Sequence, residues 1–287
     1  MTDQAENLRR QLTLKHNRKS AKTLCFISGK GGVGKSNVAL NFAIKLHQSK
    51  AKVLLIDFDI GMGNIDVLQG VSSSKTIADL FDKGIPLNEM INFAQSGVDY
   101  VSGGSGLNTI FNLEKYKRDI FFKQYDKLEQ EYDYIIFDMG AGVSENSLYF
   151  ILAADECIVV VTPEPTSITD GYGMIKHVVN KRQNMPIYVV MNRSRTNLSG
   201  RNAVRKFKQV IWEFLNKDIE VIGILPDDKL VPTAVIKQIP FILLNQKAPI
   251  SKAMDEMVKN YLSNRVHSSK RKTISFIEKL KVLIKER

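Results

Sequence analysis

Short runs of consecutive apolar residues recur along the chain, and stretches with helical spacing separate them. The runs with the length and β-branched content of strands are 23–27, 53–58, 100–101, 134–137, 157–162, 187–191 and 221–225. The stretches with helical character are 37–44, 110–130, 144–153, 167–183, 201–216 and 250–263. Continuous apolar runs are typical of strands covered on both faces, and their alternation with helices favours right-handed parallel crossovers. The pattern therefore predicts an α/β fold with a mostly parallel, doubly wound sheet.

The loop after the first predicted strand fits the phosphate-binding pattern G-x-x-x-x-G-K-[ST] at every position, with the sequence Gly29-Lys30-Gly31-Gly32-Val33-Gly34-Lys35-Ser36. Its glycines allow backbone N–H groups to converge on phosphates, and the positive end of the following helix adds to the attraction. We expect the loop and Asn37 to bind a nucleotide in a P-loop NTPase fold. Lys35 should neutralise the β- and γ-phosphates, and Ser36 should supply a hydroxyl to Mg²⁺.

Two predicted strands end in carboxylates. Asp57 and Asp59 follow the run 53–56, and Asp138 follows 134–137. Ligands bind at the carboxyl ends of strands in open α/β sheets, and a carboxylate beside a phosphate loop can hold Mg²⁺ directly or through water. Asp138 is therefore a candidate for the metal site, and Gly140 begins a glycine-containing segment that can move when the γ-phosphate leaves. For Asp57 and Asp59, the alternative is a solvated pair at a strand end.

The basic excess lies almost entirely at the two ends of the chain. The net charge of the 287 residues is +11, of which residues 1–22 carry +4 and residues 265–287 carry +6. Such ends favour acidic partners or surfaces.

Cys25 and Cys157 lie in strand-like runs without metal-ligand spacing, so we expect buried free thiols in a cytoplasmic protein. With no run of roughly 20 apolar residues and no signal peptide, we expect a protein that is neither integral nor secreted.

The pattern divides the chain into an amino-terminal segment (1–22), a central domain (23–264) and a basic hinge with a carboxyl-terminal helix (265–287). One stripe of that last helix holds the apolar residues Phe276, Ile277, Leu280, Leu283 and Ile284, with Lys281 and Lys285 beside it. A basic amphipathic helix of this kind favours reversible binding to an anionic membrane. The alternative is that the helix packs on its own domain, as the nucleotide-free or ADP state.

The loop resembles the deviant Walker A loop of the MinD/ParA ATPases, because it carries a second lysine, Lys30. Residues 57–66 resemble the first switch of that family, and the resemblance covers 23–264. It implies a slow, dimer-dependent ATP hydrolase that uses ATP/ADP and Mg²⁺. In an ATP-sandwiched homodimer, Lys30 would reach the partner's phosphates, Asp59 would position the attacking water, and Asp57 would help to order the Mg²⁺ shell. A solvated loop charge is the alternative for Lys30.

Two loops after late strands resemble the base-binding elements of this family. The first contains Asn192 and Arg193, and the second contains Pro226 and Asp228. An amide side chain can pair with both the donor and the acceptor on the edge of adenine, so Asn192 is the candidate for base selection. Asn is also an ordinary turn residue, and ATP rather than GTP rests on the family.

The amino-terminal segment resembles the activator motif of the flagellar FlhG group of this family, through the residues Asp3, Gln4, Ala5, Leu8 and Arg9. The resemblance implies binding to an FlhF-type GTPase and stimulation of its GTP hydrolysis, with Gln4 as a key contact. It also implies control of flagellar number and placement through the switch proteins of the flagellar C-ring, at the inner face of the cell membrane when ATP is bound. A disordered leader is the alternative for this segment.

Two other functions remain open at this stage: a MinD-like division-site ATPase and a ParA-like DNA-partitioning ATPase. The cations that a DNA-binding surface would use are Arg193, Arg195, Arg201, Arg205, Lys206 and Lys208. We interpret them as a solvated helix face, and nucleic acid is not an expected partner. The single tryptophan, Trp212, is predicted to lie in the core.

Overall fold

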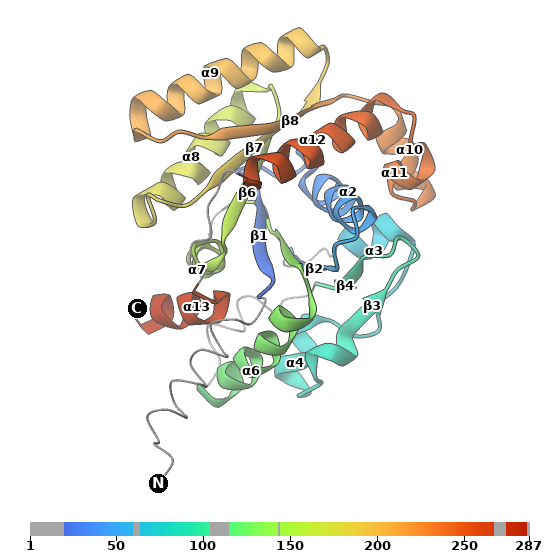
Figure 1. The fold of residues 1–287 in the computed structure, drawn as a ribbon, viewed down its shortest axis with the longest axis vertical. Helices are drawn as coiled ribbons and strands as arrows, with labels where there is room; N and C mark the ends of the chain where they lie inside the picture. The colour runs from blue at the N-terminus through green and yellow to red at the C-terminus, as the bar shows by residue number, and fades with distance from the viewer. Residues whose placement is uncertain (1–19, 60–63, 104–114, 143, 267–273, 286–287) are drawn as a thin grey trace.

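An eight-stranded sheet forms the centre of the molecule, in the order β3-β4-β2-β5-β1-β6-β7-β8 (Figure 1). This computed structural model describes residues 20–59, 64–103, 115–142, 144–266 and 274–285. The strands are β1 (Lys22–Ile27), β2 (Val53–Phe58), β3 (Ile91–Phe93), β4 (Asp99–Val101), β5 (Tyr134–Met139), β6 (Glu156–Val161), β7 (Ile187–Ser194) and β8 (Glu220–Pro226). Every pairing is parallel except that of β3 with β4. The predicted α/β class and its parallel sheet are confirmed.

Helices cover both faces of the sheet, and each face has its own apolar core. They are α2 (Lys35–Gln48), α3 (Asn64–Gln69), α4 (Ile77–Asp82), the 3₁₀ helix Leu87–Met90, α6 (Lys115–Glu131), α7 (Glu145–Ala153), α8 (Pro165–Lys181), α9 (Asn197–Leu215), α10 (Leu230–Lys237), α11 (Phe241–Leu244), α12 (Pro249–Val266) and α13 (Phe276–Lys285). Alternate residues of β1 enter opposite cores, with Leu24 beside α2 and Cys25 beside α7. This two-sided burial explains the continuous apolar strands of the sequence.

The loop after β1 lies at a switch point of the topology. β1 is central and has β5 on one side and β6 on the other. The chain leaves β1 toward β2 on one side and later continues to β6 on the other, so a crevice opens at the carboxyl end of β1. Open α/β sheets bind ligands at such a crevice.

The predicted burial of the two cysteines is confirmed, whereas that of the tryptophan is not. Cys25 and Cys157 are buried free cysteines, as predicted. The prediction for Trp212 is wrong, because 58% of its surface is exposed. Phe207 and Ile211 form the core-facing side of α9, and Trp212 is one residue beyond Ile211, which turns it outward. Within the described ranges, no helix is both long and apolar enough to span a bilayer.

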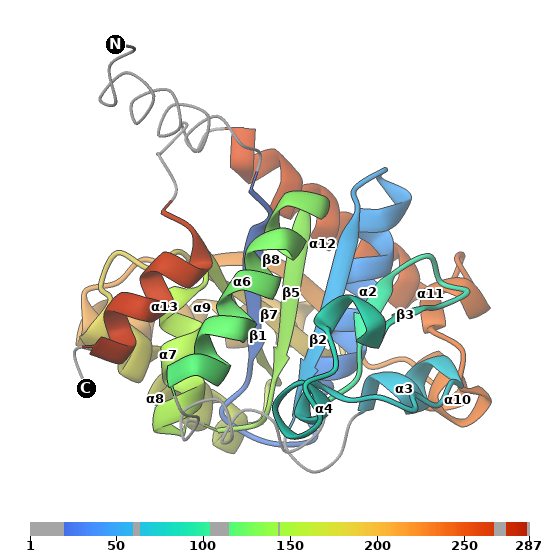
Figure 2. The same cartoon turned by 90° about the horizontal axis from the view of Figure 1, so that it is seen from below.

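Helix α13 packs on its own domain, alongside α6 and α7 (Figure 2). Phe276, Ile277 and Leu280 are buried, and the ring of Phe276 lies 4.9 Å from that of Tyr125 and 5.1 Å from that of Phe137. The alternative of a helix packed on its own domain therefore describes this state of the protein, and membrane binding of the helix stays a prediction. The apolar stripe that favours membrane binding covers the core instead.

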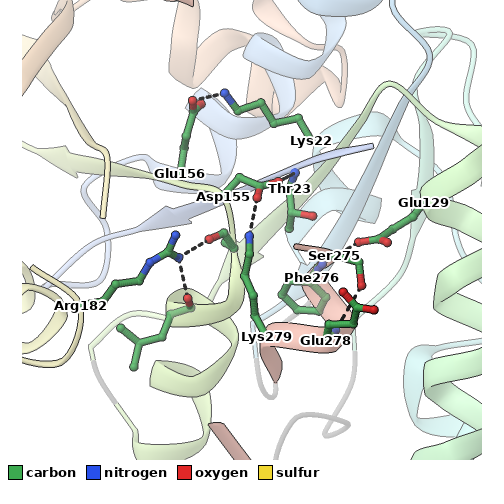
Figure 3. A network of polar contacts seen from close by, with 12 residues as sticks. Lys22, Thr23, Glu129, Asp155, Glu156, Arg182, Ser275, Phe276, Glu278 and Lys279 are labelled. Atoms are coloured by element: carbon green, nitrogen blue, oxygen red, sulfur yellow. Dashed lines mark hydrogen bonds and ion pairs between the residues drawn. The ribbon is translucent and has the colours of Figure 1, made fainter. Parts of the chain in front are cut away.

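Polar contacts hold the start of α13 in place (Figure 3). The backbone N–H of Phe276 donates to Glu129 Oε1 at 3.0 Å, and Lys279 Nζ donates to Asp155 Oδ1 at 2.5 Å. The other carboxylate oxygen of Asp155 accepts the N–H of Thr23 at 2.9 Å. Asp155 thus joins α13 to the first strand, and the helix is tied to the domain at two points of its first turn.

The stability of the protein should fall as pH rises from about 5 to 7.5. Burial raises the pKa of Glu129 to about 7, and the nearby charges of Asp126 and Asp155 add to the rise. Because the folded state holds this proton more tightly than the unfolded chain, its contribution is full below the unfolded pKa and is lost as pH passes the folded value. The loss is roughly 2–3 kcal/mol at about 1.36 kcal/mol per pKa unit.

Urea unfolding of the wild type and of Glu129→Gln at several pH values measures this slope. We expect a flatter profile for the variant. Asp57, whose pKa burial also raises to about 7, contributes equally in both proteins. Parallel profiles for the two proteins would show that Glu129 does not carry the effect.

Candidate nucleotide-binding site

The predicted phosphate loop joins β1 to α2 and has the backbone of a phosphate cradle. Gly32 and Gly34 have φ values of +77° and +88°, a region that favours glycine. Lys35 is the first residue of α2, so Ser36 follows within the first turn. The N–H of Gly142 donates to the carbonyl of Ser28 at 3.0 Å, which ties the segment after β5 to the loop. The predicted switch segment after β5 is therefore hydrogen-bonded to the residue that precedes the phosphate loop.

A buried ion pair lies at the centre of the site. Lys35 Nζ contacts Asp138 Oδ1, and the two side chains are 6% and 0% exposed. Asp57 is opposite Asp138 in the register of β2 and β5. Burial, and then the charge of Asp138, raise the pKa of Asp57 to about 7, while N–H groups of Asp59 and Ile65 and the charge of Lys35 act against the rise. The site thus holds two carboxylates with one buried cation.

The donors present fit a divalent cation of the Mg²⁺ type. Asp138 Oδ2 is buried and has no hydrogen-bond partner in the described part of the chain, so one carboxylate oxygen is available to an ion. The hydroxyl of Ser36 would supply a further oxygen ligand of the kind that Mg²⁺ prefers. Both carboxylate oxygens of Asp57 already accept backbone N–H groups, from Asp59, Asn64 and Ile65, so Asp57 would act on the ion through water. Among the described residues, no three His, Cys, Asp or Glu side chains form a metal cluster. Water and phosphate oxygens would complete the shell.

Asp59 lies at the mouth of the site, facing the segment after β5. It is half-buried, and burial raises its pKa. A Cβ at Gly140 would come within 3.4 Å of Asp59 Oδ1, so the predicted water-positioning residue and the predicted switch glycine are neighbours. The alternative of a fully solvated Asp57 and Asp59 pair is wrong for Asp57, which is 1% exposed.

Lys30 lies on the rim of the site and contacts the start of α8. Its Nζ is 3.2 Å from Thr166 Oγ1 and 3.7 Å from Glu164 Oε2, and its side chain is 44% exposed. Neither Glu164 nor Thr166 is among the residues predicted from the sequence. The string Thr-Pro-Glu-Pro after strand β6 is the signal that marks this rim, since it places polar residues at another strand end.

A cavity of about 990 Å³ lies next to the phosphate loop. The predicted nucleotide residues that line it are Gly34, Asn37, Asn192, Arg193, Pro226 and Asp228. Apolar residues of α10 and α11, which the sequence did not single out, form the opposite wall with Val231, Val235, Ile236 and Phe241. Polar groups on one side and apolar groups on the other suit a flat base next to a phosphate site.

Asn192 and Asp228 hold this cavity in shape. Asn192 Nδ2 donates to the carbonyl of Val33 at 2.8 Å, which joins the end of β7 to the phosphate loop. The carboxylate of Asp228 accepts the N–H groups of Leu230 at 2.9 Å and Ile250 at 3.2 Å. Asp228 therefore secures the starts of α10 and α12, and its two acceptor oxygens are already engaged.

The remaining predicted residues lie away from this site. Asp3, Gln4, Ala5, Leu8 and Arg9 fall outside the described residues. On α13, Leu283 and Ile284 are half-buried, Lys281 lies over the ring of Phe122 at 5.0 Å, and Lys285 is exposed. The six cations between 193 and 208 are exposed, and the four from Arg201 onward lie on α9, as the interpretation of a solvated helix face requires. Arg193 lies in β7 and Arg195 in the loop after it, and both line the cavity instead.

Comparison with known proteins gives matches along most of the chain. A family profile described as "ParA: NUBPL iron-transfer P-loop NTPase" matches residues 19–262. The antiactivator FleN of Pseudomonas aeruginosa is 33% identical over 218 residues, 76% of this chain and 78% of that protein. The flagellum site-determining protein YlxH of Helicobacter pylori is 29% identical over 238 residues, 80% of each chain. In the MinC:MinD cell division complex of Aquifex aeolicus, one chain superposes with a TM-score of 0.70 and 25% identity, covering 85% of this chain and 96% of that one.

Proposed function

Because the chain belongs to the ParA/MinD family of P-loop ATPases, we propose that it hydrolyses ATP as a membrane-associating switch that controls flagellar number and placement. Hydrolysis is slow and depends on a homodimer formed around ATP. The observation that carries the proposal is the packing of α13, whose apolar stripe is buried on the same domain that holds the phosphate loop and the buried Lys35–Asp138 pair. A switch needs one element that can adopt two arrangements. The packed α13 is the first arrangement, and α13 bound to the membrane is the second.

The residues of the phosphate site divide the work of hydrolysis. Lys35 exchanges Asp138 for the β- and γ-phosphates, which leaves the Asp138 carboxylate to Mg²⁺ together with Ser36 and Asp57. Mg²⁺, when bound, neutralises charge on the phosphate oxygens. Asp59 orients the attacking water, and the loop from Gly31 supplies backbone N–H groups. Asn192 and the cavity beside it hold adenine, so the nucleotide is ATP or ADP.

Lys30 completes the site of a second copy. Its ion pair with Glu164 is exposed, and exposed pairs contribute about 0–1 kcal/mol, so Lys30 can leave α8 at small cost. In the ATP dimer, its ammonium binds the phosphates of the partner subunit. Hydrolysis is then dimer-dependent, because one copy alone lacks this cation.

Release of α13 couples the dimer to the membrane. The stripe that binds the domain is the same stripe that enters a bilayer surface, so the helix can occupy only one of them at a time. Burying large apolar side chains in lipid contributes about 1.5 kcal/mol or more each, and each nearby lysine adds roughly 1 kcal/mol on anionic lipid. Two released helices in a dimer bind far better than one. The protein is therefore cytoplasmic and joins the inner face of the cell membrane with ATP.

Leu283→Gln should weaken ATP-dependent vesicle binding by about ten-fold or more, since burial of one leucine is worth roughly 1.5–3 kcal/mol. Leu283 is only half-buried on the domain, so the packed state should survive. Val282→Gln is the matched control, because Val282 is 55% exposed and lies off the stripe. Co-sedimentation with phosphatidylglycerol-containing vesicles, with ATP and with ADP, measures the effect. Equal binding of both variants, or equal binding with ADP and ATP, would contradict the proposal.

The flagellar role is supported by the relatives FleN and YlxH, one named as an antiactivator and the other as a site-determining protein of the flagellum. In this proposal, the amino-terminal segment binds an FlhF-type GTPase through Gln4, and the domain meets switch proteins of the C-ring. GTP hydrolysis by such a GTPase, with a peptide of residues 1–22 and its Gln4→Ala variant, tests this part.

A further inference from the structure

Strand β8 forms an edge of the sheet. It pairs with β7 and with no other strand in the described ranges. Only Ile222 and Leu225 of its seven residues are fully buried, whereas every residue of β5 and β6 is buried. An edge strand presents N–H and C=O groups to which another chain can pair.

A groove of about 550 Å³ follows this edge, within the range of volumes that hold ligands. Its floor is β8, from Val221 to Ile224 and Pro226. Asn197 and Arg201 of α9 form one wall, and Lys252, Glu256 and Asn260 of α12 form the other. Figure 1 shows the two helices on opposite sides of β8. The groove is distinct from the nucleotide cavity, with which it shares Pro226.

The floor of the groove has a backbone group that points outward. Asn260 Nδ2 donates to the carbonyl of Ile222 at 3.2 Å, so this carbonyl faces α12 rather than β7. The amide of Asn260 occupies the place that the N–H of a neighbouring strand would take. An edge protected by one side chain can exchange that side chain for a strand.

Charge is distributed unevenly along the groove. Arg201 and Lys252 have no ion-pair partner in the part of the chain that the structure describes, and both are exposed. Gly200 packs against Ile224, and Lys252 precedes Asn260 by two helical turns, about 12 Å at 1.5 Å per residue. Both cations therefore lie at the carboxyl end of β8. Glu256, one helical turn after Lys252 on the same wall, is the acidic residue that lines the groove, and Glu220 lies at the amino end of β8.

The cationic end also holds a polar group without a partner. Ser194 lines the groove, is 2% exposed, and its Oγ has no hydrogen-bond partner among the described residues. A carboxylate between Arg201 and Lys252 would pair with both cations, which outnumber the one acidic side chain of the lining, Glu256. A peptide that runs parallel to β8 brings its own carboxyl end to this point.

We infer that this groove binds an extended peptide of a partner protein as an added parallel strand, with a carboxylate at the peptide's carboxyl end between Arg201 and Lys252. Backbone hydrogen bonds to β8 give affinity, and the two cations fix the direction. A second copy of this chain fits poorly, because α9 and α12 rise on both sides of β8 and two such grooves would meet wall against wall. The inference is independent of ATP hydrolysis and of α13.

Fluorescein-labelled hexapeptides with alternating valines and a free carboxyl-terminal aspartate are the probes, and anisotropy with the full chain is the readout. We expect at least one of a varied set to bind. N-methylation of its alternate amides should weaken binding about ten-fold or more, since it removes strand pairing. Arg201→Gln and Lys252→Gln should each weaken it about five-fold or more. Arg205→Gln is the matched control, because it removes an exposed cation of α9 that does not line the groove.

Hydrogen exchange separates strand addition from simple charge attraction. Bound peptide should slow exchange of the β8 amides and leave those of α13 unchanged. The inference is wrong if no probe binds, if the N-methylated peptide binds equally well, or if Arg205→Gln matters as much as Arg201→Gln. Peptide-free dimerisation that Arg201→Gln abolishes would instead identify a second copy as the occupant and overturn the proposal.

Discussion

Lys35→Ala should lower the free energy of unfolding of the nucleotide-free protein by about 3–5 kcal/mol and abolish ATP binding. Lys35 and Asp138 form an ion pair in which both side chains are buried. Removal of the lysine leaves the Asp138 carboxylate charged and uncompensated beside Asp57. The second oxygen of Asp138 has no hydrogen-bond partner in the described structure, so no other group there would stabilise the carboxylate once Lys35 is removed. In the proposed mechanism, the same lysine therefore stabilises the fold and binds phosphate.

Urea unfolding with and without ATP measures both effects. Lys45→Ala is the matched control, since Lys45 pairs with Asp255 nearer the surface and should cost about 1 kcal/mol or less. Adding Asp138→Asn to Lys35→Ala should recover much of the stability, because it removes the stranded charge, but not ATP binding. If Lys35→Ala costs no more than Lys45→Ala, the buried pair does not form in solution.

The strands and the phosphate loop were predictable because their signals are local. A buried parallel strand must be apolar throughout, as in 134–137, and a phosphate loop needs glycines at left-handed positions, as at Gly34. The meeting of Asp57 with Asp138 was also predictable, since parallel strands bring their carboxyl ends to one edge. The order of the strands then places both next to Lys35.

The features that the sequence did not predict depend on competition between surfaces. The stripe of α13 is apolar whether it meets lipid or α7, so its periodicity cannot distinguish the two. The outward position of Trp212 depends on which face of α9 meets the sheet. The contact of Lys30 with Glu164 joins loops 134 residues apart, and no local pattern specifies it.

Asp59→Ala should reduce phosphate release by about 100-fold or more, which is the scale of a positioned acid–base or water-orienting group. Asp59 is not the ion-pair partner of Lys35 and does not line the nucleotide cavity, so ATP should still bind. Its carboxylate faces Gly140, where the γ-phosphate and the second switch are expected to meet. Hydrolysis should therefore fail after the dimer forms, and the ATP dimer should accumulate.

Phosphate release and light scattering with ATP, measured on the same samples, test this order of events. Glu145→Ala is the matched control, since it removes an exposed carboxylate at the start of α7, beyond the same switch segment. Asp59→Asn keeps the size of the side chain and a hydrogen-bond acceptor but removes the charge. A rate of phosphate release by Asp59→Ala within two-fold of that of the wild type would show that Asp59 does not take part in hydrolysis. If the variant binds ATP but stays monomeric, Asp59 acts in dimerisation rather than in hydrolysis, because the proposed mechanism requires Lys30 from a second copy.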